Sequence, residues 1–179
     1  LLLTLASIGL LAATKINDPD TMQYLASGRY MYEHGLENGC VFNYASDQCQ
    51  VVYPQWLFHL LTYGVHRAGS WNALVALQIA IALGVFAVVA VIHRRKSSHP
   101  LVSAAFCLLA AMVARERFML RADFFALLPA VLLYGVLEAY WDDARTTASR
   151  RALLPALAGI QLVWANTHGS FYVAFVILG

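Results

Sequence analysis

The chain has 179 residues, of which 60% are hydrophobic and only 12% are charged, and its mean hydropathy is +0.62. About a quarter of the residues in a soluble domain are charged, so this composition excludes an ordinary soluble domain. The formal net charge of +2 says little about partners, and we expect no nucleic-acid partner.

The apolar residues form long blocks, which predict an all-α, polytopic transmembrane helical bundle. Residues 71–93, WNALVALQIAIALGVFAVVAVIH, exceed the roughly 20 residues that cross a hydrocarbon core. Further spans are expected at about 1–14, 100–120, 124–141 and 152–168, with the start of another at 171–179. We treat 1–179 as a single transmembrane domain. Because the chain begins without Met and ends within an apolar run, we expect it to belong to a larger protein.

Two short basic connectors orient the predicted bundle. The segments HRRKSSH at 93–99 and DDARTTASRR at 142–151 carry Lys and Arg, and short loops of this kind are normally cytoplasmic. The loop 15–69 then lies on the extracytoplasmic side, together with the turn 115–123 and the segment 166–170. The arginines of that turn depart from the charge rule.

The extracytoplasmic loop contains two predicted interfacial helices. Asp18 followed by Pro19 is typical of a helix start, and Gly35 is typical of a helix end. The helix 19–34 between them carries Met and Tyr side chains and few charges, which suits the membrane surface. The segment 54–69, PQWLFHLLTYGVHRAG, predicts a second helix of this kind that leads into the span at 71.

Cys40 and Cys49 bracket VFNYASDQ, which reads as two short extended stretches around a turn. A disulfide between them would clip a small hairpin and would require an oxidising compartment. The alternative is a pair of unpaired thiols.

Asp18 and Asp20 open the first interfacial helix. One interpretation is local: a capping carboxylate and a partner for the helix dipole. The other is functional, because two carboxylates at this spacing can hold a divalent cation or supply a general base.

The second polar cluster is ARERFMLRADFF, residues 114–125. The apolar run 101–114 spans only about 21 Å as a helix, so it must borrow from this charged stretch to cross a membrane. Arg117 and Arg121 are four residues apart and are predicted to share a helix face. Such arginines suit an anionic ligand such as a lipid phosphate. The alternative is internal ion pairing with Glu116, Asp123 or the two aspartates of the first cluster.

The third cluster is WANTHGSF, residues 164–171, in which Asn166 and His168 interrupt an apolar stretch. Polar groups at membrane depth persist only where protein or a cavity satisfies them. They predict either a buried, hydrogen-bonded histidine or part of a site. The predicted topology places all three clusters on the outer side, which favours one common site.

Four motifs in order carry a resemblance to a known class: DPDTMQYLASGRYMYEHG, YPQWLFHLL, RFMLRADFFALL and WANTHGSFYVAF. The chain resembles the N-terminal half of bacterial GT-C class glycosyltransferases, the oligosaccharyltransferase, protein mannosyltransferase and aminoarabinose transferase type. The resemblance covers nearly the whole chain. It departs from many relatives at Met22, Gln23 and Tyr24, where they carry Trp.

The resemblance implies sugar transfer from a polyprenyl-phosphate donor to an acceptor on the extracytoplasmic side, in a multi-pass protein of a bacterial plasma membrane. It implies Asp18 as the principal acid with Asp20 beside it, and in some members a divalent metal, Mg or Mn, at these two residues. The lipid phosphate would be bound by three arginines, Arg115, Arg117 and Arg121. Sugar or acceptor would be bound by Asp123, Asn166 and His168.

Two other functions fit the sequence. A non-catalytic membrane scaffold or accessory subunit of a larger complex would use the same polar residues as structural ion pairs. A transporter would use intramembrane charges and the break at 166–170, although the 179 residues show no internal repeat.

Overall fold

The computed structural model describes residues 2–36, 54–96, 99–142 and 146–178, and every regular element in these ranges is helical. The prediction of an all-α fold is therefore confirmed for the described residues. The main helices are α1 (Leu2–Ala12), α2 (Pro19–His34), α3 (Trp56–Arg95), α4 (Pro100–Val113), α5 (Ala122–Tyr140) and α7 (Leu154–Thr167). Shorter elements are η1 (Arg115–Arg117), α6 (Thr147–Arg151), η2 (Gly169–Tyr172) and α8 (Val173–Leu178).

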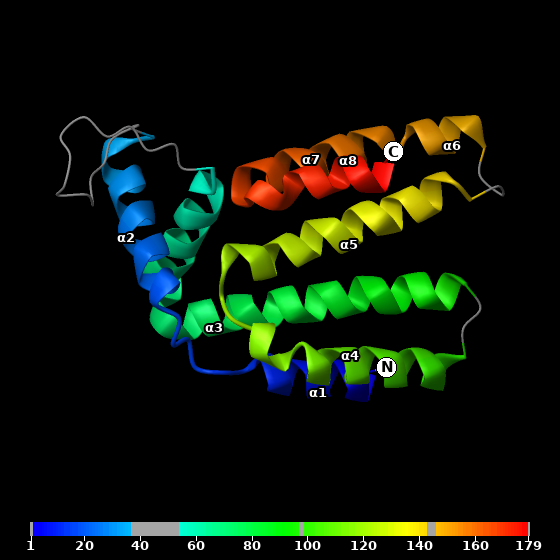
Figure 1. Cartoon of the computed structure of the whole chain (residues 1–179), viewed down its shortest axis with the longest axis horizontal. Helices are drawn as coiled ribbons and strands as arrows, with labels where there is room; N and C mark the ends of the chain where they lie inside the picture. The colour runs from blue at the N-terminus through cyan, green and yellow to red at the C-terminus, as the bar shows by residue number, and fades with distance from the viewer. Residues whose placement is uncertain (1, 37–53, 97–98, 143–145, 179) are drawn as a thin grey trace.

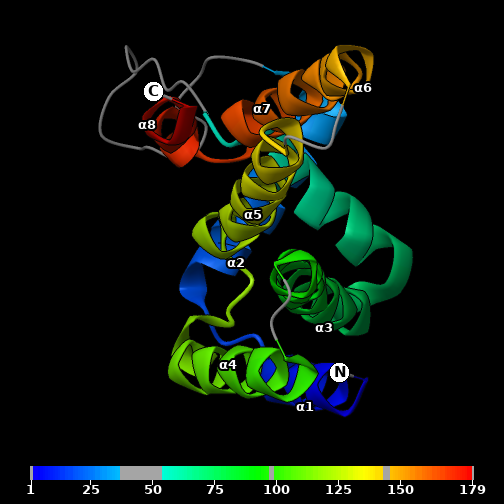
Figure 2. The ribbon, with the colours of Figure 1, turned by 90° about the vertical axis from the view of Figure 1, so that its right-hand side faces the viewer.

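Most helices lie alongside one another in layers, and one pair crosses their ends. Figure 2 shows the layers in order: α1 with α4, then the second part of α3, then α5, then α7 with α8. In Figure 1, α2 and the first part of α3 run across the left-hand end of this stack. Buried apolar side chains form two clusters, one around α1, α3 and α4 and one around α5, α7 and α8.

Helix α2 has the boundaries that its sequence predicts. The Asp18 side chain caps it by accepting a hydrogen bond from the backbone N–H of Asp20, and Pro19 occupies the first turn. Gly35 ends the helix with a φ of 87°, and its N–H donates to the carbonyl of Met31 at 2.9 Å. A positive φ suits glycine because it has no Cβ.

Helix α3 is broken between the predicted interfacial segment and the predicted span. Gly69 and Ser70 leave the helical conformation, and Ser70 has a φ of 59°. A Cβ at residue 69 would lie 2.7 Å from the Cβ of Ala73, so glycine is required for this turn. The break lets the first part of α3 pack along α2 while the second part runs within the stack (Figure 1).

The packing of α2 on α3 depends on a close backbone approach at Gly28. An added Cβ there would lie 2.2 Å from the carbonyl oxygen of His59 and 2.8 Å from the Cβ of Tyr63. Around this contact the Tyr24 ring meets Phe58 edge-on, with centroids 5.1 Å apart. The two helices therefore form one closely packed unit.

Two of the described helices, α3 and α5, are long and apolar enough to cross a membrane. The helix of the expected span 100–120 ends at Val113, so α4 has only 14 residues and is about 21 Å long. The multi-pass topology thus stays a prediction. Cys40 and Cys49, with their expected hairpin, lie outside the described residues.

We predict that Gly28→Ala lowers the free energy of unfolding by about 1–3 kcal/mol or more, because the new methyl group forces α2 away from α3. Thermal unfolding of the detergent-solubilised protein measures this change. Gly64→Ala is the matched control, since a Cβ there meets nothing within 4 Å. That variant should be neutral or more stable by up to roughly 1 kcal/mol, and equal effects at both glycines would contradict the close packing.

Candidate functional site

The segment that links α4 to α5 has some side chains in the core and others at the surface. After the single turn of η1, Phe118 and Leu120 are buried, whereas Met119 between them is exposed. The Oγ1 atom of Thr14 donates to the carbonyl of Phe118 at 3.5 Å, and that of Thr21 donates to the carbonyl of Leu120 at 3.4 Å. The link is thereby fixed against the start of α2.

The expectation that Arg117 and Arg121 share a helix face is wrong. Arg117 belongs to η1 and is exposed, whereas Arg121 precedes α5 in an extended conformation, with φ of −125° and ψ of 158°. The chain leaves the helix at Val113, so the four-residue spacing no longer places the two side chains one above the other.

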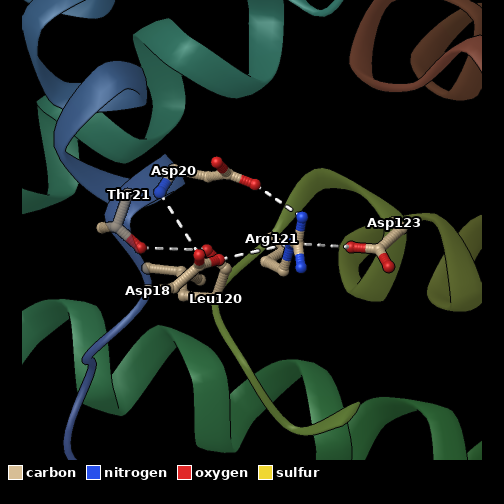
Figure 3. Close-up of polar contacts among 6 residues, drawn as sticks. All are labelled: Asp18, Asp20, Thr21, Leu120, Arg121 and Asp123. Carbon is tan, nitrogen blue, oxygen red and sulfur yellow. Dashed lines mark hydrogen bonds and ion pairs between the residues drawn. The ribbon is translucent and has the colours of Figure 1, made fainter.

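Arg121 lies among three carboxylates that come from two helices (Figure 3). Its Nη2 donates to Oδ2 of Asp20 at 2.5 Å, and its Nε lies 3.2 Å from Oδ2 of Asp18 and 3.8 Å from Oδ1 of Asp123. The Asp18 side chain is only 6% exposed, whereas the Arg121 side chain is 42% exposed. This Arg121 cluster joins the start of α2 to the start of α5.

The electrostatics of the cluster favour the charged guanidinium. The Asp18 carboxylate, followed by those of Asp20 and Asp123, raises the pKa of Arg121 above its ordinary value, while partial burial opposes the rise. Burial and then the charge of Asp20 raise the pKa of the nearby Tyr24 hydroxyl. Arg121 is therefore a fixed positive charge at every physiological pH.

A pocket of about 170 Å³ lies beside the Arg121 cluster, between the segment before α2 and the link after α4. Asp18, Lys15, Arg115 and Glu116 are its charged lining residues. Neither Lys15 nor Arg115 forms an ion pair with any residue that the structure describes. The pocket is smaller than the roughly 300–1,000 Å³ of sites for drug-sized ligands, so it suits a small polar group.

Gln78 also lines this pocket, although none of the three polar clusters in the sequence includes it. Its side chain is buried within the apolar part of α3 and donates to the carbonyl of Ala12 at 2.7 Å and to Oγ1 of Thr14 at 3.0 Å. Its Oε1 has no hydrogen-bond partner among the described residues. The available signal was a polar residue inside the run 71–93, which is rare at membrane depth.

Asn166 and His168 lie at the same end of the stack but are engaged with protein groups. Asn166 Oδ1 accepts from Nε1 of Trp56 at 2.8 Å, and its Nδ2 donates to the carbonyl of Leu162. His168 Nδ1 accepts from the backbone N–H of Ser170 and lies 2.7 Å from its Oγ. His168 is thus hydrogen-bonded through Nδ1, although it is half-buried rather than buried.

The two aspartates of the expected cation site are engaged with protein groups in this arrangement. A guanidinium occupies the position between them, and Asp18 Oδ1 already accepts a backbone hydrogen bond. Among the described residues there is no group of three or more His, Cys, Asp or Glu side chains that would hold a metal ion. A divalent cation at Asp18 and Asp20 stays a prediction.

The polar residues selected from sequence are thus divided among three environments. Asp18, Asp20, Asp123 and Arg121 meet in the cluster, Arg115 lines the pocket beside it, and Arg117 touches neither.

Comparisons with protein-family models, with curated proteins and with solved structures gave no match for this chain.

We predict that Arg121→Gln lowers the free energy of unfolding by about 1–3 kcal/mol, because the buried Asp18 carboxylate loses its counter-charge. The value is below that of a fully buried pair because solvent screens the half-exposed guanidinium. Thermal unfolding in detergent tests this. Adding Asp18→Asn to Arg121→Gln should restore part of the loss.

Arg117→Gln is the control for the same loss of charge from an exposed side chain without an ion pair in the described ranges. It should change stability by no more than about 0.5 kcal/mol. Equal losses in the two single variants would contradict a specific role of the Arg121 cluster.

Proposed function

We propose that this chain is the N-terminal membrane part of a GT-C-like glycosyltransferase. It transfers a sugar from a polyprenyl-phosphate donor to an acceptor on the extracytoplasmic side of a bacterial plasma membrane, within a multi-pass protein. The resemblance of its four motifs supports this class, and the two long apolar helices α3 and α5 are compatible with membrane insertion.

The observation that carries the proposal is that Asp18 and Arg115 line the same pocket. Sugar transfer from a lipid phosphate needs a group that orients or deprotonates the acceptor hydroxyl and a cation that neutralises the departing phosphate. A carboxylate and an arginine that has no ion-pair partner among the described residues supply both kinds of group at one small pocket.

In the proposed reaction, the acceptor hydroxyl attacks the anomeric carbon of the donor. The new glycosidic bond forms as the bond between that carbon and the phosphate oxygen breaks, and the phosphate leaves with the bonding electrons. Asp18 orients the acceptor and takes its proton, while Arg115 and Lys15 neutralise the phosphate. Arg121 holds Asp18 in place, and Arg117 has no role in this scheme.

The helix pair that crosses the end of the stack supports the direction of donor entry. Helix α2 and the first part of α3 lie roughly across the axes of the other helices (Figure 1), as interfacial helices do. In a membrane with α3 and α5 as spans, this pair lies at the water–lipid boundary next to the Asp18 pocket. A lipid-linked donor would approach along it.

A second candidate function, a non-catalytic scaffold, is favoured by a different observation. Arg121 forms ion pairs with three carboxylates, and the Asn166 amide forms hydrogen bonds with Trp56 and Leu162. Such contacts are expected of residues whose role is to hold helices together. The two functions differ at Arg115, which lines the pocket, because sugar transfer requires its charge there and a scaffold does not.

We predict that Asp18→Asn lowers transfer from a polyprenyl-phosphate sugar by at least about 100-fold in the full-length protein, the lower range for loss of a general base. Asparagine caps helices as well as aspartate, so α2 keeps its start. Arg115→Gln should lower transfer by about 10-fold or more without changing the midpoint of thermal unfolding. Both rates are measured with a radiolabelled donor in reconstituted vesicles.

Glu33→Gln is the matched control, since Glu33 is an exposed carboxylate that pairs, within the described part of the chain, with Arg29 of its own helix. It should leave the rate unchanged. Full transfer by a folded Asp18→Asn protein would refute the catalytic role. Unchanged transfer in Arg115→Gln, with loss of stability in Asp18→Asn alone, would favour the scaffold.

A further inference from the structure

A groove runs between the second part of α3 and α5, at the opposite end of the stack from the Arg121 cluster. It consists of two adjoining hollows of about 380 Å³ and 350 Å³ that share Ile92, Arg95, Gly135 and Ala139. We call it the α3–α5 groove. From Ala87 to Arg95 it follows α3 for about 12 Å, at 1.5 Å per residue.

Gly135 lies in the wall of the groove, where it presents no side chain. A Cβ at this position would lie 3.4 Å from Cδ1 of Ile92 and 3.6 Å from Cγ1 of Val88, so any longer side chain would enter the space between the helices. The walls of the inner hollow are almost entirely apolar, with Val91, Leu132 and Val136 among them. This part of the groove suits a hydrocarbon chain.

The mouth of the groove is basic. Arg95 lines both hollows and forms no ion pair with any residue that the structure describes, whereas Lys96 pairs with Glu138 at 2.9 Å. Apart from Arg94, which does not line the groove, the described residues at this end of the stack contribute four Lys and Arg side chains against the carboxylates of Glu138 and Asp142: Arg95, Lys96, Arg150 and Arg151. Trp141, 57% exposed, also lines the mouth.

An apolar groove with a basic mouth between two candidate spans has the chemistry of an anionic lipid site. The acyl chain gains from burial against the apolar walls, and the phosphate gains from the Lys and Arg side chains at the mouth. An indole at the mouth is typical of the headgroup region. A water-soluble phosphate would use only the mouth and would leave the apolar hollow unfilled.

We propose that the α3–α5 groove binds one anionic glycerophospholipid of the surrounding bilayer, with an acyl chain along Val88 and Val136 and the phosphate on Arg95. The inference rests on the membrane insertion included in the proposed function, and it is independent of sugar transfer. The site is separate from the Asp18 pocket and takes a structural lipid rather than a donor.

The test uses the full-length protein in nanodiscs of equimolar phosphatidylglycerol and phosphatidylcholine. After transfer to mild detergent, native mass spectrometry counts the lipids that remain bound. We expect one phosphatidylglycerol to be retained in preference to phosphatidylcholine. Arg95→Gln should reduce this preference about fivefold, equivalent to roughly 1 kcal/mol for one basic residue near the surface.

Arg94→Gln is the matched control, because it removes the same charge from the adjacent position, which does not line the groove. It should change retention by less than twofold. Gly135→Leu should abolish retention by filling the groove. Gly159→Leu, in the apolar groove between α5 and α7, should not change it.

Equal retention of the two lipids would overturn the inference, as would equal losses in Arg94→Gln and Arg95→Gln or full retention in Gly135→Leu. Displacement of the lipid by free glycerol phosphate would also overturn it, because the acyl chain would then contribute nothing. Release of the protein from membranes by alkaline carbonate would instead refute the membrane location, so the two failures are distinguishable.

Discussion

The ion pairing of Arg121 is the interaction on which the polar end of this molecule depends. It connects the first turn of α2 with the first turn of α5, two elements that lie far apart in the sequence. Asp18 is nearly buried, and an ionised carboxylate is costly to bury unless a counter-charge and hydrogen bonds accompany it. The guanidinium and the backbone N–H of Asp20 supply both. The position of α2 follows, and with it the pocket on the other side of Asp18.

The position of α2 in turn determines how the first part of α3 lies. The near contact of Gly28 with the His59 carbonyl leaves no room for sliding or tilting between the two helices. The break at Gly69 and Ser70 then turns the chain into the stack. One ion-paired cluster, one glycine contact and one break thus account for the whole crossing unit. The stack itself is held mainly by apolar packing.

Local signals in the sequence predicted local structure well. Asp18 with Pro19 and the later Gly35 gave both ends of α2, because caps act through the nearest backbone groups. Gly69 similarly coincided with the end of the predicted interfacial segment. The predicted sharing of a helix face by Arg117 and Arg121 failed, because α4 ends at Val113 and the chain between the two arginines is not helical.

The partners of the charged residues could not be chosen from the sequence alone. Several carboxylates were available to Arg121, and only the placement of α2 against α5 selects among them. The partners of Gln78 are carbonyl and hydroxyl groups near the end of α1. The sequence of α3 does not indicate these contacts, so the role of Gln78 was not predicted. The resemblance to GT-C transferases predicted which residues to consider, and its functional content stays a proposal.

The order of synthesis gives the Arg121 cluster a further consequence. Asp20 precedes Arg121 by 101 residues, so at about 5–20 residues per second the aspartates leave the ribosome roughly 5–20 s before their counter-charge. During that interval Asp18 and Asp20 lack the guanidinium that pairs with them in the folded protein, and the start of α2 cannot make this contact. The closing of this end of the molecule is therefore a late event in biogenesis. It cannot occur before the link between α4 and α5 has been synthesised, however fast the earlier helices form.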